Sequence, residues 1–334
     1  MSKKIAVFVG GGSNDSVYSE ATYKNIAEIV DFPIGRKTVT KDMIDEYKTL
    51  LQSADYLFST WGMIPFTKEQ IAEYLPNCKA VFYAAGSVQF FARPFIESGI
   101  LVFSAWVANA VPVAEYTFAV MSLANTGFFS THRNLTSPSG WHHDGHPGNY
   151  DATFGFISYG MISQMAIERV KKNLENIRVL VSSTSLTKEK ADALGIELVD
   201  IPTIFREADV ISNHLANNEH TVGMLNKDVF KLMKPNATFV NTGRGAQVVE
   251  ADLIDALTEC PDRTAVLDVT WPEPPKEDSP FYKMPNVFMT PHIAGSLGNE
   301  VHRMADYMLY ELRALEAGEE LKYSVTLKML EKMA

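Results

Sequence analysis

Cysteine is scarce in this chain: Cys78 and Cys260 are the only two among 334 residues. Two thiols so far apart build neither a disulfide scaffold nor a zinc site, which favours a reducing compartment and predicts no metal centre. Runs of lysine and arginine are missing as well, and the formal net charge is -10. Because phosphate binding needs a concentrated basic surface, this charge argues against nucleic acid or an anionic membrane as the main partner.

Long apolar runs are equally scarce, and the sequence suggests none that approaches the length of a membrane span. The apolar stretch after Lys3 and Lys4 is short and lacks a small-residue cleavage pattern, so it predicts a first strand rather than a signal peptide. With 46% hydrophobic and 21% charged residues, the composition is that of a soluble globular protein. We therefore expect a cytoplasmic location, and the length allows two domains of ordinary size.

Short apolar runs alternate with helix-like polar stretches along the chain. Such alternation predicts βα units and parallel sheets, so the expected fold class is α/β. A first series of apolar runs lies at residues 4–9, 54–60, 79–85 and 100–105. A second series begins at residues 153, 178, 197, 209, 237, 265 and 286 and predicts a fuller, doubly wound sheet.

Two helices are expected to connect and complete these domains. Residues 114–123 (AEYTFAVMSL) are apolar almost all round, which is typical of a buried helix that joins two domains. The last helix carries apolar residues from Val301 to Leu315 at spacings of three and four, and Gly318 provides a stop. Because this helix follows the last strand of the second series, we expect it to pack back on the first domain, which becomes discontinuous.

The stretch after the first of these helices, residues 124–152, shows little periodicity but contains Phe128, Phe129 and Trp141. A long irregular segment with aromatic side chains fits an arm that grips a partner subunit. It fits a surface loop that covers its own domain equally well. The sequence leaves both interpretations open.

Three segments in the last third each place a reactive side chain just after an apolar strand: Arg244 after ATFVNTG, Glu273 after TAVLDVT and His292 after NVFMTP. Ligands of a parallel α/β sheet bind outside the carboxyl ends of its strands, so we expect these residues to converge. The guanidinium fork of Arg244 suits a substrate carboxylate. A hydrogen bond from His292 to Glu273 would fix one tautomer of the imidazole and favour its cationic form. The set indicates proton transfer to an oxygen beside a carboxylate.

A dinucleotide loop is expected after the strand at 153. Residues 158–163 (SYGMIS) stand where a Rossmann fold binds pyrophosphate, but of the pattern Gly-x-Gly-x-x-Gly they retain only the middle glycine. That glycine lets the backbone approach the phosphates, whereas serine at the two outer positions adds a small side chain to a tight turn and to helix packing. The expected cofactor contacts in this loop are Ser158, Tyr159, Gly160, Met161 and Ile162.

The choice between NAD and NADP rests on the end of the next strand. An NAD site carries an acidic residue there, which holds the ribose hydroxyls, and this chain has Ser183. Without a carboxylate, a ribose phosphate is not repelled and NADP is admissible. The nearest cation is Lys188, and no arginine stands beside it. The sequence leaves the two cofactors open.

Taken together, these segments resemble the D-isomer-specific 2-hydroxyacid dehydrogenases over most of the chain, and most strongly from Asp209 to Ser296. Residues 241–245 (NTGRG) are similar to the segment with the family's substrate arginine. Residues 267–274 (LDVTWPEP) resemble the segment with its acidic partner, and residues 290–295 (TPHIAG) the one with its acid/base histidine. Upstream, residues 85–88 (AGSV) resemble the loop whose backbone amides receive the substrate carboxylate.

The resemblance implies a flavodoxin-like substrate domain at 1–115, completed by 299–334, a Rossmann-type dinucleotide domain at 116–298, and an active site in the cleft between them. It implies an NAD(P)-dependent oxidoreductase, commonly a homodimer, that interconverts a small 2-keto acid such as glyoxylate or hydroxypyruvate and its D-2-hydroxy acid. In this scheme Arg244 binds the carboxylate, Glu273 orients His292, and His292 is the acid/base. Further cofactor contacts would be Ser183, His214, Ala216, Thr242, Gly243, Asp268 and Gly295, and further substrate contacts Gly86, Ser87 and Trp61.

Several alternatives stay open at this level. Trp61 follows a strand and either walls the substrate pocket or belongs to the core. His214 either lines the cofactor or is a core histidine with satisfied hydrogen bonds. The whole chain is alternatively a catalytically weak, dinucleotide-sensing interaction protein, because the family also includes the C-terminal-binding corepressors. A structural protein with an inherited site is a third option, since fold does not fix function.

Overall fold

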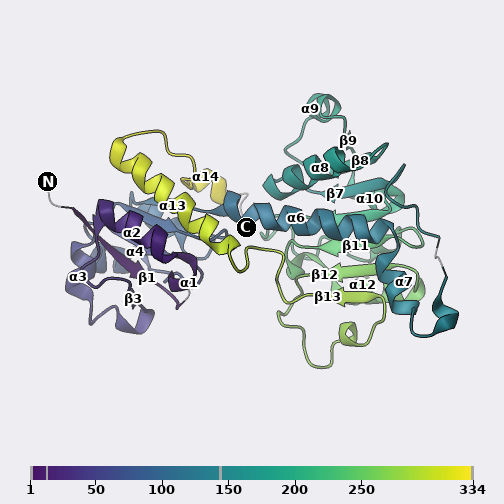
Figure 1. Cartoon of the computed structure of the whole chain (residues 1–334), viewed down its shortest axis with the longest axis horizontal. Helices are drawn as coiled ribbons and strands as arrows, with labels where there is room; N and C mark the ends of the chain where they lie inside the picture. The colour runs from purple at the N-terminus through teal and green to yellow at the C-terminus, as the bar shows by residue number, and fades with distance from the viewer. Residues whose placement is uncertain (1–2, 13, 143–144, 332–334) are drawn as a thin grey trace. The chain divides into compact units, whose positions relative to one another are not determined.

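The computed structural model describes residues 3–12, 14–142 and 145–331. The chain divides into two compact units (Figure 1). Ala110–Gly295 form the central unit, and Met1–Asn109 with Ser296–Ala334 form the discontinuous unit. The sequence predicts the same kind of division, with changes of domain after residues 115 and 298.

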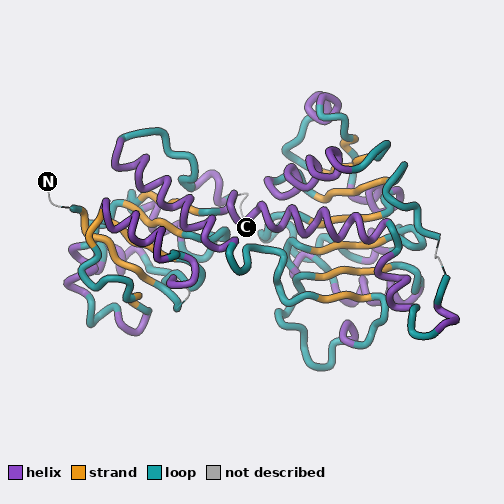
Figure 2. The backbone as a smooth tube through the Cα atoms, viewed as in Figure 1, coloured by secondary structure: helices purple, strands orange, loops and turns teal. Residues whose placement is uncertain are grey.

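The central unit is built on a parallel sheet in the order β13-β12-β11-β10-β7-β8-β9 (Figure 2). Each apolar run of the second series forms a strand, as predicted. The strands are β7 (Thr153–Ile157), β8 (Arg178–Ser182), β9 (Glu197–Leu198), β10 (Val210–Asn213), β11 (Thr238–Asn241), β12 (Thr264–Leu267) and β13 (Val287–Met289). Its helices after β7 are α8 (Met161–Asn173), α9 (Lys188–Ala193), α10 (Ile201–Glu207), α11 (Lys227–Phe230) and α12 (Glu250–Glu259), with 3₁₀ turns at Gly245–Gln247 and Pro280–Tyr282.

Helices cover both faces of this sheet. Side chains of α10, α11 and α12 pack in one apolar cluster, and those of α8 pack in another. Strands buried on both faces read as continuous apolar runs, which is why the sequence locates them so well. In the sheet, β7 lies between β8 and β10, so the strand order reverses there. The carboxyl ends of β7 and β10 therefore form the switch point at which such sheets bind ligands.

The discontinuous unit has a second parallel sheet, in the order β2-β1-β4-β5-β6, with β3 also paired to β1. Apart from β3, this is the flavodoxin-like order that the resemblance implies. The strands are β1 (Lys4–Val9), β2 (Val30–Asp31), β3 (Thr38–Val39), β4 (Tyr56–Ser59), β5 (Ala80–Tyr83) and β6 (Leu101–Ser104). Its helices before β6 are α1 (Asn14–Val17), α2 (Glu20–Ile29), α3 (Lys48–Ser53), α4 (Lys68–Tyr74) and α5 (Ala92–Glu97), with a 3₁₀ turn at Lys41–Met43.

The last long helix, α13 (Glu300–Ala317), returns to the first sheet as predicted. Its buried side chains, including Met304, Met308 and Leu312, join the apolar cluster of β1, β4 and β5. It ends at Gly318, whose φ of 67° is the left-handed conformation that glycine adopts without strain. A short helix, α14 (Leu327–Leu330), follows.

Three expectations for the middle of the chain need correction. Helix α6 (Trp106–Asn125) begins eight residues before the predicted start at 114. It includes Pro112, a residue that disfavours helix interiors, so the sequence pattern understates the length of the helix. By length and composition α6 passes the test for a membrane span, contrary to expectation, but half of the tested window is buried inside the protein, as in a core helix. The stretch after it is not irregular throughout, since α7 (Phe128–Asn134) and a 3₁₀ turn at Pro138–Gly140 lie within it.

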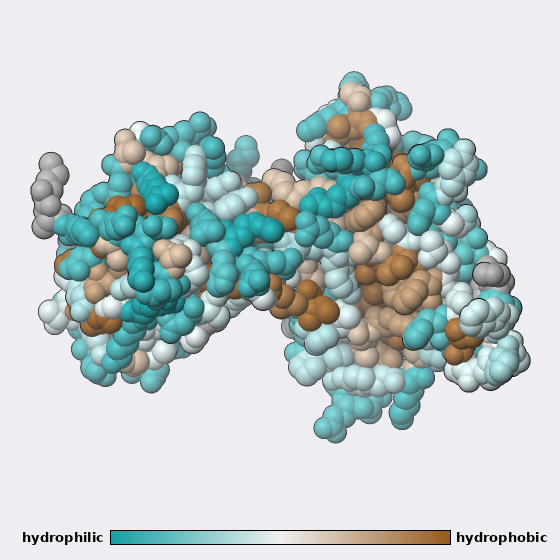
Figure 3. Space-filling model, viewed as in Figure 1, coloured by the Kyte–Doolittle hydropathy of each residue, from teal (hydrophilic) through white to brown (hydrophobic). Residues whose placement is uncertain are grey.

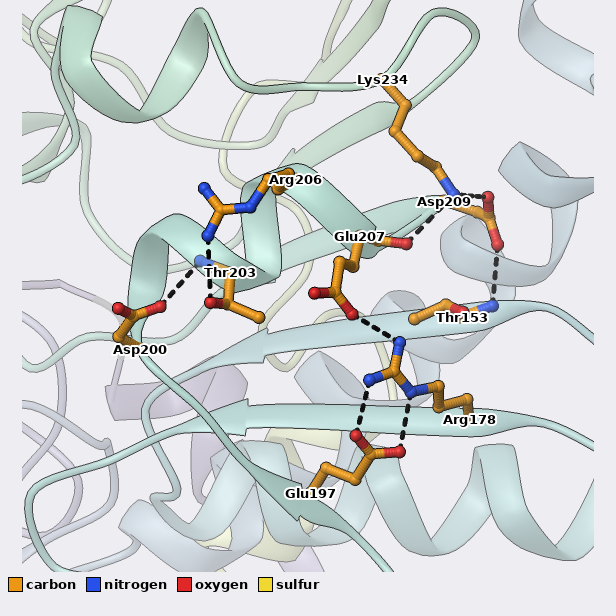
Figure 4. Close-up of polar contacts among 9 residues, drawn as sticks. All are labelled: Thr153, Arg178, Glu197, Asp200, Thr203, Arg206, Glu207, Asp209 and Lys234. Atoms are coloured by element: carbon orange, nitrogen blue, oxygen red, sulfur yellow. Dashed lines mark hydrogen bonds and ion pairs between the residues drawn. The ribbon is translucent and has the colours of Figure 1, made fainter.

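Charged residues at the amino-terminal edge of the central sheet pair with one another. Arg178, at the start of β8, binds both carboxylate oxygens of Glu197 at 2.6–2.7 Å and Glu207 at 2.6 Å (Figure 4). Asp209 accepts a hydrogen bond from the backbone N of Thr153 at 2.8 Å and pairs with Lys234. These ion pairs hold strand ends together at the edge opposite to the expected site.

Candidate active site

The expected ligand residues of the central unit all follow strands at the carboxyl-terminal edge of its sheet. Residues 158–162 follow β7, and Ser183 follows β8. His214 and Ala216 follow β10, and residues 242–244 follow β11. Asp268 and Glu273 follow β12, and His292 and Gly295 follow β13. Because neighbouring parallel strands end at the same edge, residues far apart in sequence share one surface.

Glu273 and His292 contact each other directly. Oε1 of Glu273 lies 2.6 Å from Nδ1 of His292, and the two side chains are 40% and 47% exposed. Since an ionised carboxylate can only accept, the Nδ1–H of His292 is the donor. This contact fixes the tautomer of His292 and leaves its ring accessible to a small molecule.

Asp268 holds the loop that carries His292. Its carboxylate accepts hydrogen bonds from the Thr290 hydroxyl at 2.7 Å, the Ile293 N at 2.7 Å and the Ala294 N at 3.0 Å. The Asp268 backbone oxygen also accepts from the His292 N at 3.0 Å. His292 itself has a φ of 55°, which is rare for a residue with a side chain. These contacts stabilise that conformation of the loop.

Arg244 is brought close to the segment of Glu273 by a glycine. A Cβ at Gly245 would lie 2.0 Å from the carbonyl carbon of Thr270, so only glycine allows this approach of the two segments. Nη1 of Arg244 donates to the Gly243 oxygen at 2.7 Å. Burial lowers the pKa of the Arg244 guanidinium, and the charge of Glu273 opposes this shift. Arg244 and Glu273 therefore lie within electrostatic range of each other.

His214 is buried, with 8% of its surface exposed. Its Nε2 lies 2.9 Å from the Ser212 hydroxyl, and its Nδ1 lies 3.5 Å from the hydroxyl of Thr242. The ring stacks on Phe156 of β7. Burial lowers the pKa of His214 to about 3, so the imidazole is neutral. These contacts are those of a core histidine, and they place it beside Thr242 at the switch point.

This shift makes the stability of the protein depend on pH. Below the usual pKa of 6.5 the unfolded chain protonates His214, whereas the folded chain does not until about pH 3. The free energy of unfolding is therefore expected to fall as the pH drops through this window. Above the window, His214 is neutral in both states and does not make stability depend on pH. Urea unfolding at pH 7.5, 6 and 5 checks this, with His214→Gln as the reference. The wild type should lose more stability on acidification than the variant, and equal losses would contradict the assignment.

The loop after β7 meets the requirements of a pyrophosphate site at its most demanding position. A Cβ built at Gly160 meets no atom within 4 Å, so the backbone at the start of the thirteen-residue helix α8 is open to a ligand. Ser158 has a φ of 83°, the conformation that favours the glycine it replaces. Ser163 is buried, and its hydroxyl finds no hydrogen-bond partner among the described residues. The residues fit a dinucleotide, with backbone strain at the first serine.

Ser183 lies in an exposed turn at the end of β8. Its hydroxyl accepts a hydrogen bond from the Ser185 N at 3.1 Å. Lys188 is 80% exposed, and its amino group lies 3.6 Å from the carboxylate of Asp192. The turn itself presents hydroxyls and no carboxylate.

The expected substrate residues of the discontinuous unit follow β4 and β5. Trp61 is 41% exposed, so the interpretation of a core tryptophan is wrong. Its loop is fixed by Gly62, where a Cβ would lie 3.1 Å from the N and Cα of Gly11. Gly86 and Ser87 are partly buried, and the Ser104 hydroxyl donates to the Gly86 oxygen at 2.8 Å.

Three buried amide side chains at this edge are not among the site residues that the sequence predicts. Asn213, Asn241 and Gln247 are almost completely buried and bind one another and the backbone around Arg244. Asn213 and Asn241 end apolar strands, and Gln247 follows the arginine by three residues. A polar side chain at the end of a buried strand is a signal, but its partners cannot be read from the sequence.

Comparisons with known proteins place the chain in a family. Residues 118–294, more than half of it, match the family model "D-isomer specific 2-hydroxyacid dehydrogenase, NAD binding domain". The chain is 34% identical over 202 residues to a D-3-phosphoglycerate dehydrogenase of Archaeoglobus fulgidus, which covers 60% of the chain and 38% of that protein. It is also 34% identical over 167 residues to a glyoxylate reductase of Thermococcus litoralis, half of each chain. The chain thus spans half or less of the length of these relatives.

Solved structures agree in fold over nearly the whole chain. The D-mandelate dehydrogenase of Rhodotorula graminis superposes with a TM-score of 0.78 at 17% identity and covers 97% of this chain and 98% of its own. A glyoxylate reductase from Paecilomyes thermophila gives 0.76 at 20% identity and covers 98% and 100%. At such identities the likeness shows the fold alone. With the family match, the expected α/β fold with a Rossmann-type domain is confirmed, and the chain belongs to the D-isomer specific 2-hydroxyacid dehydrogenase family.

Proposed function

We propose that the protein is an NAD(P)-dependent dehydrogenase that interconverts a small 2-keto acid and its D-2-hydroxy acid in the cytoplasm. The observation that carries the proposal is the 2.6 Å contact of Glu273 with His292, at the sheet edge that also presents Arg244. A bound reduced nicotinamide would supply a hydride to the keto carbon. The residues of this chain would bind the acid and deliver the proton that completes the hydroxyl group.

Each residue of the set has a distinct task in this proposal. The guanidinium of Arg244 binds the substrate carboxylate bidentately and orients the neighbouring carbonyl. His292 gives the proton on Nε2 to the keto oxygen, since its Nδ1 is engaged by Glu273. The carboxylate of Glu273 stabilises the imidazolium before transfer. In the reverse direction, neutral His292 accepts the hydroxyl proton.

The discontinuous unit favours a small, unphosphorylated substrate such as glyoxylate or hydroxypyruvate. Residues 60–66, 84–91 and 105–109 follow β4, β5 and β6 and contain neither lysine nor arginine. A substrate phosphate needs such cations, so we do not extend the phosphoglycerate activity of some relatives to this chain. In the proposal, the backbone amides at Gly86 and Ser87 bind the carboxylate, and the ring of Trp61 limits the length of the substrate side chain.

Cofactor choice is tested at Ser183. An aspartate there would repel a ribose phosphate, so Ser183→Asp is expected to lower kcat/KM with NADPH by roughly tenfold or more. Activity with NADH should stay equal or rise. Initial rates with both cofactors check this, and the neutral isostere Ser183→Asn controls for size. If Ser183→Asp leaves the NADPH value unchanged, Ser183 does not lie at the ribose.

We also propose a homodimer that forms through α6 and α7. The outward side of these helices carries Leu123 and Phe128, which are 42% and 47% exposed, and brown apolar residues gather over α6 in Figure 3. Trp141, in the following turn, is 81% exposed. Apolar side chains that cluster on a surface commonly mark an interface. The arm interpretation of residues 124–152 belongs to this proposal.

A charge in this surface is expected to separate the subunits. Leu123→Arg should convert the particle from twice the chain mass of 37.1 kDa to a single chain, because the guanidinium would be buried unpaired. Sedimentation velocity measures the mass directly. Leu194→Arg is the matched control, since this leucine is 39% exposed and lies at the end of α9. A wild type that sediments as one chain refutes the dimer.

The decisive experiment for the function is turnover. Purified protein is assayed with NADH and with NADPH against 2-keto acids of increasing size, beginning with glyoxylate. We expect turnover of the smallest acids and none of 3-phosphohydroxypyruvate. If a folded protein binds NADH or NADPH but turns over no acid, the result favours the sensing protein instead.

A further inference from the structure

A cluster of three buried amides lies directly behind Arg244. Asn213 ends β10, Asn241 ends β11, and Gln247 ends the 3₁₀ turn that follows Arg244. Their exposed fractions are 0%, 1% and 0%. Polar side chains at such depth are costly unless every donor and acceptor is satisfied.

Gln247 satisfies all of its hydrogen-bonding capacity in this cluster. Its Oε1 accepts from Asn213 Nδ2 at 2.7 Å and from the backbone N of Arg244 at 3.1 Å. Its Nε2 donates to the oxygens of Leu215 at 2.7 Å and Ala216 at 3.1 Å. A primary amide has two acceptor lone pairs and two N–H groups, so none is left over. One side chain thus joins the backbone of Arg244 to the loop after β10.

The two asparagines hold the same segment from its other side. Oδ1 of Asn241 accepts from the Gly243 N at 3.1 Å and from Asn213 Nδ2 at 3.0 Å. Nδ2 of Asn241 donates to the Arg244 oxygen at 3.3 Å. Both the N and the O of Arg244 are therefore bound by amides of this cluster, and its Cα has little freedom to move.

The amide side chains pack closely against the backbone at Gly243. A Cβ at this position would lie 2.8 Å from Oε1 of Gln247 and 3.0 Å from Nδ2 of Asn213. No side chain fits there while both amides are in place. The glycine before Arg244 is thus explained by the packing of the amide cluster.

Stability alone does not account for such a cluster. Well-packed apolar side chains stabilise a protein interior at least as well as a buried polar network of the same volume. What the network adds is a defined backbone geometry, because hydrogen bonds are directional and fix the positions of the backbone atoms that they join. The atoms joined here are those of Arg244 and of the loop with His214 and Ala216, where the substrate carboxylate and the cofactor are expected.

We propose that Gln247 is a positioning residue, which orients Arg244 toward the substrate carboxylate and couples it to the 214–216 loop at the cofactor. This inference rests on the proposed function, because it assigns Gln247 a part in the same reaction. Gln247 touches neither ligand and acts only through the backbone that it holds.

The test is Gln247→Met, which keeps the volume of the side chain and removes its hydrogen bonds. We expect KM for the keto acid to rise about ten- to a hundredfold, since small displacements of a binding group are that costly. The Kd of oxamate, a keto-acid isostere, should rise in parallel, whereas kcat should change much less. Asn286→Leu is the matched control. Asn286 is another buried amide, which donates to the oxygens of Leu257 and Arg263 before β13, at the opposite edge of the sheet.

The outcomes separate this inference from the proposed function. A wild type that neither turns over keto acids nor binds oxamate contradicts the function. If the wild type does both, and Gln247→Met matches its KM and its oxamate Kd per folded molecule, the positioning role is refuted. Hydrogen–deuterium exchange of the peptide 241–248 needs no substrate. Faster exchange there in Gln247→Met, but not in Asn286→Leu of equal melting temperature, supports the role, and unchanged exchange overturns it.

Discussion

Replacing Arg244 with alanine is expected to lower kcat/KM for the keto acid by roughly 10²- to 10³-fold or more, which is the scale of losing a desolvated, charge-assisted hydrogen-bonded pair. The side chain is partly buried, and among the residues that the structure describes its guanidinium donates only to the Gly243 oxygen. Most of its donors thus remain for a ligand. The loss should lie mainly in KM and in oxamate binding, because the variant still has His292 and Glu273.

Arg244→Lys separates charge from geometry. A lysine keeps the positive charge but has no planar fork, so we expect a value of kcat/KM between those of the wild type and Arg244→Ala. Arg206→Ala serves as the control, since Arg206 lies on α10 and its guanidinium binds Thr203 (Figure 4). Near-normal activity of Arg244→Ala would show that the carboxylate is bound elsewhere.

His292→Ala is expected to lower kcat by about 10²- to 10⁴-fold, the usual contribution of a general acid. NADH or NADPH should still bind, because the loop that fits the pyrophosphate follows β7 and does not include His292. Fluorescence titration of the reduced cofactor and steady-state rates measure the two effects separately. A variant that has lost cofactor binding as well would place His292 in the cofactor site rather than at the reacting oxygen.

Glu273→Gln completes this test. An amide at 273 accepts the Nδ1–H of His292 through its oxygen but carries no charge, so the imidazolium is less stabilised. We expect a loss of kcat that is smaller than for His292→Ala, because the amide oxygen still orients the ring. A kcat equal to that of the wild type would mean that the charge of Glu273 does not assist His292.

The fold and the positions of the candidate catalytic residues were largely predictable because parallel α/β sheets follow simple rules. Strands buried on both faces appear as continuous apolar runs, and each run in the two series became a strand. Residues just after such strands must share one edge, so the pairing of Glu273 with His292 follows from sequence order. The failures were local. The sequence did not predict the strands β2 and β3, which have only two residues each. They are defined by their pairing with β1, which lies more than twenty residues earlier in the chain.

Other details depended on burial, which a single sequence does not state. The apolar pattern predicted a helix only from residue 114, but α6 begins at Trp106 and continues through Pro112. Trp61 fitted a core residue as well as a pocket wall, and only the fold exposes it. For His214, the sequence predicted the position at the end of a strand. Only the structure shows the burial that keeps its imidazole neutral.

By itself, then, the sequence determined the two sheets, the order of their strands along the chain, and the residues that follow them: Arg244, Glu273 and His292. These depend on local pattern and on the direction of the strands. Only the tertiary structure decided which side chains hold the site, because Asn213 and Asn241 end two different strands, Gln247 lies in a turn, and the three meet in the interior. Their hydrogen bonds exist only when β10, β11 and the turn after Arg244 are packed together.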